Sequence, residues 1–580
     1  MTLLDWLLVL LYFGASIAIG LYYSKRAGKS TQEFFLSGRN LPWWLAGTSM
    51  VATTFAADTP LAVTELVAKN GIAGNWLWWN FVFGGMLTVF FFARLWRRAG
   101  VMTDVEFIEL RYSGKPAAFL RGFRALYLGL FMNCIIMGWV NVAMGSILHG
   151  LFGIPQDVVV WYVAGCMIIV GLYSALSGLW GVAVTDVFQF IVAMGGTIVL
   201  AVVVVNLPEV GGIAGLKSKL PEWTFRFLPS VGGELGVGGA LALSLSAFLA
   251  YVGVQWWASW YPGAEPGGGG YVAQRMMSAK DEKHSLFATL WFTVAHYCIR
   301  PWPWILVGLA TLVLYPDLAD RKLGYVLAMR DYLPAGLLGL LVAAFFAAYM
   351  STIATHLNWG TSYIVNDFYR RFVRRDADER YYVRISRIAT MLLMVVSILL
   401  TLIINTISGA WTFVIEAGAG LGLVLILRWY WWRLNAWSEI AAMIAPFLGF
   451  GFVKTFTEIQ FPESLYLIVA FTTLTWLAAT FLTKPTDMQT LKRFFERVHP
   501  GGSWKPVVEC VPHVRQDRGF GILAVDWLAG VLLVYNVLFG IGKLLLGDLP
   551  RAGMFFLIAA AAGTILYSHL SKVAWNKVAD

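Results

Sequence analysis

The chain has 580 residues, of which 59% are hydrophobic, 15% aromatic and only 13% charged. A water-soluble globule of this length would expose too much apolar surface, so the composition predicts an integral membrane protein. The formal net charge of +10 does not indicate a nucleic-acid partner, because the basic residues fall in short loops between apolar stretches, where they report membrane orientation.

About fifteen apolar stretches reach the roughly 20 residues that a membrane-spanning helix needs. Their approximate cores are residues 3–23, 43–66, 75–96, 121–150, 158–180, 183–206, 239–260, 285–313, 334–365, 385–407, 409–431, 437–453, 464–484, 522–541 and 553–575. We therefore expect an all-α integral membrane fold with about fifteen transmembrane helices. The first stretch lacks the positive start of a signal peptide, so we expect it to be retained as a helix.

Basic residues fall on alternate loops between these stretches. They include Lys25, Arg26, Lys29 and Arg39 after the first, Arg94, Arg97, Arg98, Arg111, Lys115 and Arg121 after the third, and Arg370, Arg371, Arg374, Arg375, Arg380 and Arg384 after the ninth. The positive-inside rule places these loops in the cytoplasm. We expect a multi-pass protein of the plasma membrane, such as a bacterial inner membrane, with the N-terminus outside and the C-terminus in the cytoplasm.

The predicted helices divide into six segments. These are a first helix with its cytoplasmic loop (1–40), a first group of five helices (41–206), a second group of five (207–435), two accessory helices (436–484), a polar cytoplasmic loop (485–520) and two C-terminal helices (521–580). Each group of five opens on an interrupted apolar stretch. Because an odd number of helices inverts the second repeat, we expect a five-plus-five inverted-repeat transporter fold with broken helices.

The two interruptions indicate where binding occurs. The first stretch carries small, polar and helix-disfavouring residues, namely Gly47, Thr48, Ser49, Thr53, Thr54, Asp58, Thr59 and Pro60. The second has Gln255 late in it and is followed by the Pro/Gly-rich segment 262–270. Broken helices at mid-membrane depth are where transporters bind ions and solutes.

Hydroxyl residues in the ninth stretch are candidates for an ion site. Ser351 and Thr355 share one helix face, and Thr352 is rotated by roughly 100° from Ser351. Sodium is a hard cation that hydroxyls and freed backbone carbonyls satisfy, and the first broken helix could supply the carbonyls of Ala52 and Phe55. The alternative is that these hydroxyls bond to the carbonyls four residues earlier.

Ionisable residues inside the membrane have more than one interpretation. Asp186 is either a cap at the start of the sixth stretch or a buried carboxylate for an ion. Asp58 and Glu416 could each serve a solute, a proton or a structural hydrogen bond. His356 could carry a proton or bond to a neighbour.

Aromatic side chains, whose faces are flat, together with nearby amides suit the binding of a sugar ring. Trp257 belongs to an aromatic cluster around the second interruption, and Asn80 lies beside tryptophans in the third stretch. The amides of Asn80 and Gln255 need partners in lipid. The alternative for the aromatic residues is that they mark the membrane interface.

Several strings resemble the sodium:solute symporter family, which includes sodium-coupled sugar, proline and sialic-acid transporters. They are Ser37-Gly38-Arg39 followed by Leu41-Pro42-Trp43-Trp44, the run from Gly178 to Asp186, Gln274-Arg275 with Ala279-Lys280, and the run from Ala347 to Tyr369. They cover most of residues 1–431 in the expected order. The resemblance implies the same five-plus-five fold.

The resemblance also implies particular site residues. The principal sodium site would consist of the carbonyls of Ala52, Phe55 and Ala348 and the hydroxyls of Ser351 and Thr352. A second sodium would use Asp186, Ser351 and Thr355, although Ala354 stands where such members carry serine. Solute contacts would come from residues near Thr59, Asn80 and Gln255, with an aromatic near Trp257 closing the inner side. With the two deep carboxylates, the expected solute-binding set is Asp58, Thr59, Asn80, Gln255, Trp257 and Glu416.

The sequence therefore predicts a sodium-coupled secondary active symporter and not an enzyme. We expect it to import a small polar solute, a sugar or related polyhydroxylated compound, by alternating access. Na⁺ is the only metal or cofactor expected, and the partners are the solute, sodium and the lipid bilayer around a monomer. The alternatives are sodium- or proton-coupled symport of an amino acid or carboxylate and, ranked lower, a transporter-like solute sensor. The Gly-rich segment is either a flexible inner gate or a passive loop.

Overall fold

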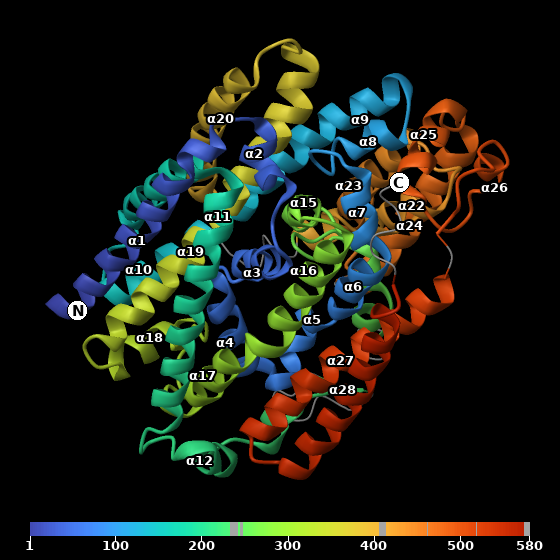
Figure 1. The fold of residues 1–580 in the computed structure, drawn as a ribbon. Helices are drawn as coiled ribbons and strands as arrows, with labels where there is room; N and C mark the ends of the chain where they lie inside the picture. Colours follow the sequence, from blue (N-terminus) through green and yellow to red (C-terminus); the bar gives the residue numbers. More distant parts are fainter. Residues whose placement is uncertain (232–241, 244–247, 405–412, 461, 518, 574–580) are drawn as a thin grey trace.

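The computed structural model describes residues 1–231, 242–243, 248–404, 413–460, 462–517 and 519–573. The protein is a bundle of helices joined by short loops (Figure 1). In these ranges, twelve helices are long and apolar enough to cross a membrane. The chain is therefore a multi-pass membrane protein.

Twelve of the fifteen predicted stretches correspond to these helices. The other three do not form a helix of spanning length within the described residues. The stretch 43–66 is split into two short helices, so neither half reaches spanning length alone. The stretches 239–260 and 409–431 lie partly outside the described residues. The second of them retains a short apolar helix, α22 (Leu421–Tyr430).

The α-helices follow one another along the whole chain. They are α1 (Leu3–Ala27), α2 (Thr31–Leu36), α3 (Trp43–Thr53), α4 (Asp58–Asn70), α5 (Trp76–Trp79), α6 (Val82–Leu87), α7 (Ala93–Ala99), α8 (Phe107–Arg111), α9 (Gly114–Leu126), α10 (Asn133–Phe152), α11 (Val159–Val205), α12 (Gly212–Lys219), α14 (Trp256–Ala258), α15 (Gly270–Ser278), α16 (Glu282–Val294), α17 (Pro301–Leu314), α18 (Leu323–Tyr332), α19 (Leu337–Ser362), α20 (Glu379–Thr401), α22, α23 (Ala436–Phe456), α24 (Glu463–Leu482), α25 (Met488–Val498), α26 (Lys505–Val508), α27 (Phe520–Leu545) and α28 (Leu549–Leu570).

Tighter and wider helical turns connect several of these helices. The 3₁₀ turns are η1 (Ser37–Arg39), η2 (Ile72–Asn75) and η5 (Glu222–Phe225), and the π segments are η3 (Thr88–Phe92), η4 (Tyr127–Met132), η6 (Ala250–Gln255), η7 (Ala295–Ile299) and η8 (Tyr363–Val373). π segments are frequent at functional sites. Here η6 and η7 flank the region that contains the cavity described below.

The long helix α11 consists of two spans that meet at Gly178. This glycine has φ 55° and ψ −166°, outside the helical region. A side chain there would also place its Cβ 2.8 Å from the carbonyl oxygen of Phe34. Glycine is therefore required at the bend, and the two halves of α11 count as separate spans, Val159–Leu176 and Gly178–Val205.

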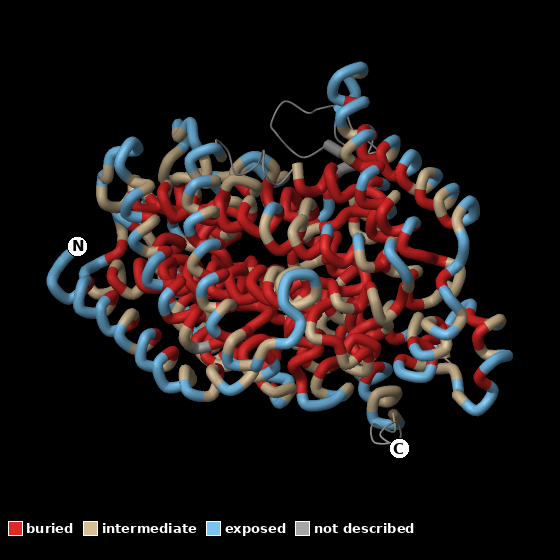
Figure 2. The backbone as a smooth tube through the Cα atoms, turned by 90° about the horizontal axis from the view of Figure 1, so that it is seen from above, coloured by how far each residue is buried: buried red, intermediate tan, exposed pale blue. Residues whose placement is uncertain are grey.

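Helix α11 lies at the centre of the packing. It runs along α19, α1 and α3, while α27 and α28 form an antiparallel pair at the edge of the bundle (Figure 1). The interior of the bundle is buried and its outer helices are exposed (Figure 2). Large apolar side chains such as Leu3, Leu482 and Leu557 are 74–88% exposed on those outer helices, as expected of surfaces that face lipid.

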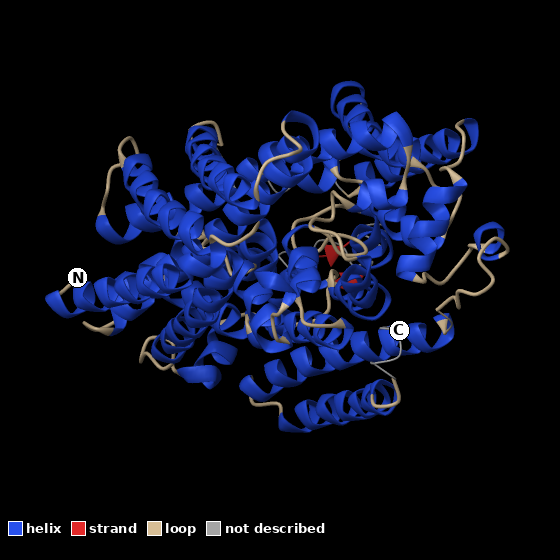
Figure 3. Ribbon diagram, turned by 45° about the horizontal axis from the view of Figure 1, so that its top comes forward, coloured by secondary structure: helices blue, strands red, loops and turns tan. Residues whose placement is uncertain are grey.

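The bundle is almost entirely helical (Figure 3). Within the described residues the strands are β1 (Ser230–Val231) and β2 (Ala242–Leu243), which pair in parallel. The architecture is the all-α membrane fold that the sequence predicts.

Candidate functional site

The first interrupted stretch is a broken helix. α3 ends at Thr53, residues 54–57 form no regular helix, and α4 begins at Asp58. Pro60 lies in the first turn of α4, where its missing N–H is tolerated. In a continuous helix its ring would clash with the carbonyl of Ala56. The carbonyl of Thr53 is therefore free to accept from a side chain of another helix, while the carbonyl of Ala52 still accepts from the backbone N–H of Phe55 at 3.0 Å.

Thr352 joins the broken helix to α19. Its hydroxyl donates to the carbonyl oxygens of Thr53 at 2.8 Å and Ala348 at 3.1 Å. Ala52 and Phe55, at the same end of α3, are buried. The structure thus brings the two sets of residues implied as sodium ligands to one place.

The oxygens at this break fit a sodium ion. Hydroxyl and carbonyl oxygens are hard, neutral donors, and no large negative charge has to be buried to provide them. Ser351, the remaining implied ligand, is also buried, and its hydroxyl donates to Asp186 Oδ1 at 2.7 Å. The ion would therefore take Ser351 from its present partner or share it.

Asp186 does not cap a helix start. It lies within the second half of α11 and is fully buried. Besides Ser351, its carboxylate accepts a hydrogen bond from Ser49 at 2.5 Å. Asp186 is therefore a buried carboxylate and not a helix cap, and its use for an ion stays a prediction.

Arg275 on α15 lies among the residues implied for a second sodium. Its Nη2 is 3.7 Å from Asp186 Oδ2 and donates to Thr355 Oγ1 at 2.8 Å. Its Nε donates to Ser49 Oγ at 3.1 Å. Asp186, Ser351 and Thr355 are thus brought together, but around a fixed guanidinium.

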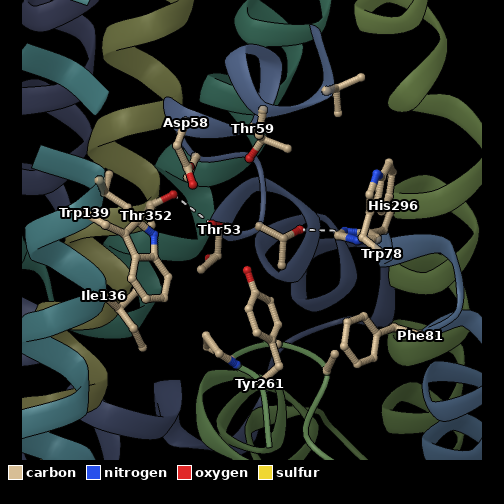
Figure 4. A pocket seen from close by; sticks show the side chains of 18 of the residues that line it. Thr53, Asp58, Thr59, Trp78, Phe81, Ile136, Trp139, Tyr261, His296 and Thr352 are labelled. Atoms are coloured by element: carbon tan, nitrogen blue, oxygen red, sulfur yellow. Dashed lines mark hydrogen bonds between the residues drawn. The ribbon is translucent and has the colours of Figure 1, made fainter. Parts of the chain in front are cut away.

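A cavity of about 330 Å³ lies beside the break (Figure 4). This volume is within the roughly 300–1,000 Å³ typical of small-molecule sites. The polar lining residues are Thr53, Thr54, Asp58, Thr59, His296, Arg300, Thr352 and His356, and the aromatic ones are Trp78, Phe81, Trp139, Tyr251, Tyr261, Tyr271 and Tyr297. Because Thr53 and Thr352 belong both to the break and to the cavity lining, the ion site and the cavity share a wall.

Two of the predicted solute-binding residues line this cavity. Asp58 and Thr59 both do so, and they point toward it from the start of α4 (Figure 4). Asp58 is 4% exposed, and its Oδ1 has no hydrogen-bond partner within the described residues. An acceptor oxygen is therefore available to a bound molecule.

Asn80, Gln255 and Glu416 are buried but do not line the cavity. The Asn80 amide donates to the carbonyl of Leu77 at 2.8 Å, and the Gln255 amide donates to the same carbonyl at 3.4 Å. Glu416 accepts from Ser464 at 3.0 Å. In this structure Gln255 and Glu416 join segments distant in sequence, whereas the Asn80 amide bonds to carbonyls of its own preceding turn.

Trp257 also lies outside the cavity lining, with its indole N–H donating to the carbonyl of Gly253 at 2.5 Å. Tyr261, four residues later, points into the cavity instead (Figure 4). The aromatic residue that bounds the cavity after the second interruption is therefore Tyr261.

The sequence prediction missed Thr54, His296 and Arg300. Thr54 Oγ1 lies 2.9 Å from His296 Nδ1 and accepts from Arg300 Nη1 at 2.9 Å. His296 and Arg300 could have been found from the sequence, because they are ionisable residues inside the apolar stretch 285–313. An ionisable residue at membrane depth marks a functional site by default.

The segment from Tyr261 to Gly269 forms one boundary of the cavity, and we call it the strap. Pro262, Gly263 and Ala264 line the cavity together with Tyr261. The carbonyl of Gly267, further along the strap, accepts from the Trp96 indole at 2.9 Å. The strap thus bounds the cavity on one side, and the hydrogen bond from Trp96 fixes it to α7.

Residues 34–446 match the family model described as the sodium:solute symporter family. The chain is 24% identical over 509 residues to the sodium/glucose cotransporter of Vibrio parahaemolyticus, covering 82% of this chain and 91% of that protein. It is 24% identical over 450 residues to the osmoregulated proline transporter OpuE of Bacillus subtilis (strain 168), covering 75% and 85%.

A solved structure has the same fold. It is the substrate-bound outward-open state of a Na⁺-coupled sialic acid symporter, with a TM-score of 0.66 at 18% identity, covering 84% of this chain and 99% of that one. The similarity confirms the five-plus-five transporter fold.

Proposed function

Since the chain belongs to the sodium:solute symporter family, we propose that it imports a sugar or related polyhydroxylated solute together with sodium by alternating access. Sodium-coupled symport follows from the family, while the solute is our proposal. The observation that carries it is the wall shared by the ion ligands and the aromatic-lined cavity, through Thr53 and Thr352. An ion at the break would fix the same residues that bound the solute.

The sodium gradient is sufficient for accumulation. One sodium moving down 100 mV supplies about 2.3 kcal/mol, and a tenfold concentration ratio adds about 1.4 kcal/mol. A neutral solute could then be concentrated several hundredfold, without any chemical reaction on the solute.

One sodium per cycle is the stoichiometry we assign. The principal site needs only oxygens at the break, whereas a second ion at Asp186, Ser351 and Thr355 would lie next to the Arg275 guanidinium. Two cations beside one carboxylate repel each other. A second sodium would therefore require Arg275 to leave Thr355.

The basic loops support the proposed orientation. Arg39 donates to the Gly100 carbonyl at 2.6 Å, Arg98 pairs with Glu282 at 2.9 Å, and Arg371 pairs with Glu109 at 3.0 Å. These contacts place the loops after the first, third and ninth predicted stretches at one end of the bundle. We assign that end to the cytoplasm, with the N-terminus outside.

The strap is the part of the cavity boundary we assign to the inner gate. Arg98 and the Trp96 indole that holds the strap belong to the same helix, α7. The strap therefore lies toward the end of the bundle assigned to the cytoplasm. Its movement away from the cavity would open the inward path.

The second candidate is symport of an amino acid or another carboxylate. The observation that favours it is the pair of oppositely charged groups, Asp58 and Arg300, on the cavity lining. Proton coupling would instead use His356 or Asp58, and it predicts uptake that persists without sodium.

Uptake into proteoliposomes tests the proposal. Purified protein should accumulate a radiolabelled solute when an inward sodium gradient is imposed, and an equal potassium gradient should not drive accumulation. Uptake that persists in sodium-free buffer but is lost when an imposed pH gradient is removed would contradict sodium coupling. Conversion of the solute to a product would contradict transport.

A further inference from the structure

Arg300 is a buried cation on the cavity wall. It directly precedes α17, is 1% exposed and lines the cavity. Across the described residues, no carboxylate oxygen lies within 4.0 Å of its guanidinium. An unpaired charge inside a membrane protein is costly, so its presence points to an anion that arrives with the solute.

The guanidinium is held firmly while donors remain available. Nη1 donates to Thr54 Oγ1 at 2.9 Å, and Nη2 lies 3.4 Å from His296 Nε2. The Trp304 ring lies 5.1 Å away, and Nε has no partner in the described part of the chain. Because a guanidinium carries five N–H donors in a planar fork that matches a carboxylate, this one can accept a further ligand.

Asp58 provides the complementary acceptor. It lines the same cavity from α4, and its Oδ1 lacks a hydrogen-bond partner among the described residues. Asp58 and Arg300 do not form an ion pair within 4.0 Å. The cavity therefore presents a fixed donor group and a fixed acceptor that do not satisfy each other.

A sodium ion at the break changes the charge balance of the cavity. Arg300 Nη1 lies 3.4 Å from the carbonyl of Val51, the neighbour of Ala52. Asp186, which accepts from the proposed ligand Ser351, already has Arg275 as its counter-charge. The ion and the Arg300 guanidinium would thus be two further positive charges, with Asp58 as the carboxylate on the cavity lining. A neutral solute leaves an excess positive charge in this buried region, whereas a carboxylate removes it.

We propose that the solute carries a carboxylate that binds Arg300 and a hydroxyl or ammonium group that donates to Asp58. The proposal rests on sodium-coupled symport and narrows the solute to a sugar acid, with an amino acid as the other source of the same chemistry. Arg300 determines specificity, and His296 contacts both Thr54 and the guanidinium.

Two matched pairs of compounds test the role of the carboxylate. Glucuronate and glucose differ by a carboxylate at one carbon, and proline and prolinamide differ in the same sense. Thermal melts of the purified full-length protein are recorded with each compound in sodium and in potassium buffer. In sodium, the acid of at least one pair should bind at least tenfold more tightly than its partner.

Variants assign that preference to Arg300. Arg300→Gln should abolish the tenfold preference for the acid while the shift caused by sodium alone persists. Arg300→Lys keeps the positive charge but lacks the planar fork of N–H donors, so it should reduce the preference for the acid. This variant provides the test if Arg300→Gln does not fold. Arg330→Gln, at a 48% exposed side chain, should leave the preference unchanged.

The outcomes that overturn the proposal are distinct from those that overturn symport. Glucose or prolinamide binding as tightly as the acid, no shift from either acid, or a preference that survives both Arg300 variants contradicts the role of Arg300. Acid binding that is equally tight in potassium contradicts sodium coupling and leaves the role of Arg300 intact.

Discussion

The hydroxyl of Thr352 donates to the carbonyl oxygen of Thr53 at 2.8 Å, so α19 and the broken end of α3 are in direct contact. The oxygens proposed to bind sodium belong to both helices. The site is therefore complete only while the two helices stay together, and binding sodium must stabilise that contact by mass action.

Removing both hydroxyls from α19 should weaken sodium binding. For Ser351→Ala with Thr352→Ala we expect a rise of at least about 100-fold in the sodium concentration for half-maximal uptake, since each ligand contact to a charged group is worth about 1.5–3 kcal/mol and two are removed. The measurement is the sodium dependence of uptake into proteoliposomes. Thr352→Ser, which keeps a hydroxyl, should behave like the wild type, as should Thr361→Ala, whose hydroxyl lies 3.0 Å from Thr390. Normal sodium dependence in the double variant would contradict the site.

Asp186 and Arg275 should be energetically coupled. Asp186→Asn or Arg275→Gln leaves the other group buried without its counter-charge, which typically costs about 3–5 kcal/mol. The double variant should lose less stability than the sum of the singles. Thermal or denaturant unfolding of the four proteins measures the coupling, and additive losses would show that the 3.7 Å pair contributes nothing.

Gly263→Ala should impair turnover. This strap residue has φ +81°, and an added Cβ would lie 2.0 Å from the Tyr271 hydroxyl. A side chain in the left-handed region costs roughly 1–2 kcal/mol before any clash is counted. We expect at least a tenfold lower maximal uptake rate, measured at saturating sodium and solute. Gly165→Ala, a helical position with no neighbour within 4 Å of the added atom, is the matched control, and equal rates in the two variants would contradict a gating role for the strap.

Neutralising two buried glutamates should have different effects on the stability of the protein. Glu439 accepts from both Arg124 and Arg428, so Glu439→Gln removes the counter-charge of two guanidinium groups and should destabilise the protein by about 3–5 kcal/mol. Glu265, in the strap, is 4% exposed, and its Oε2 has no hydrogen-bond partner within the described residues. Glu265→Gln replaces a buried carboxyl group whose Oε2 has no partner, so the unfolding midpoint should stay unchanged or rise. A large destabilisation by Glu265→Gln in the same melts would contradict this.

The sequence predicted the architecture well because span length and hydropathy are local properties. Twelve predicted spans satisfy the length and composition of a transmembrane helix, and the break before Asp58 follows from Pro60. Ser351 and Thr352 were also identifiable, since hydroxyls inside an apolar helix need partners wherever that helix packs. The division of α11 into two spans was predicted as well, because residues 158–180 and 183–206 were separate stretches, whereas the φ angle of Gly178 that produces the bend cannot be inferred from hydropathy.

The lining of the cavity was harder to predict because its residues come from distant segments. Asn80 and Gln255 are polar residues at the expected depth, but their amides bond to the carbonyl of Leu77 and not into the cavity. Arg300 is an ionisable residue inside an apolar stretch, but its contact with Thr54 is visible only in the structure. Which face of a helix a polar side chain occupies is decided by packing, and hydropathy does not report it.

The cavity is bounded on different sides by two kinds of structure. Its walls carry side chains such as Trp78, Trp139 and His296, whereas below them Pro262, Gly263 and Ala264 present mainly main chain. Substitutions in the walls can change which molecule is accepted without altering the strap, the segment that we propose as the inner gate. Evolution could in this way diversify the cargo while retaining one release mechanism.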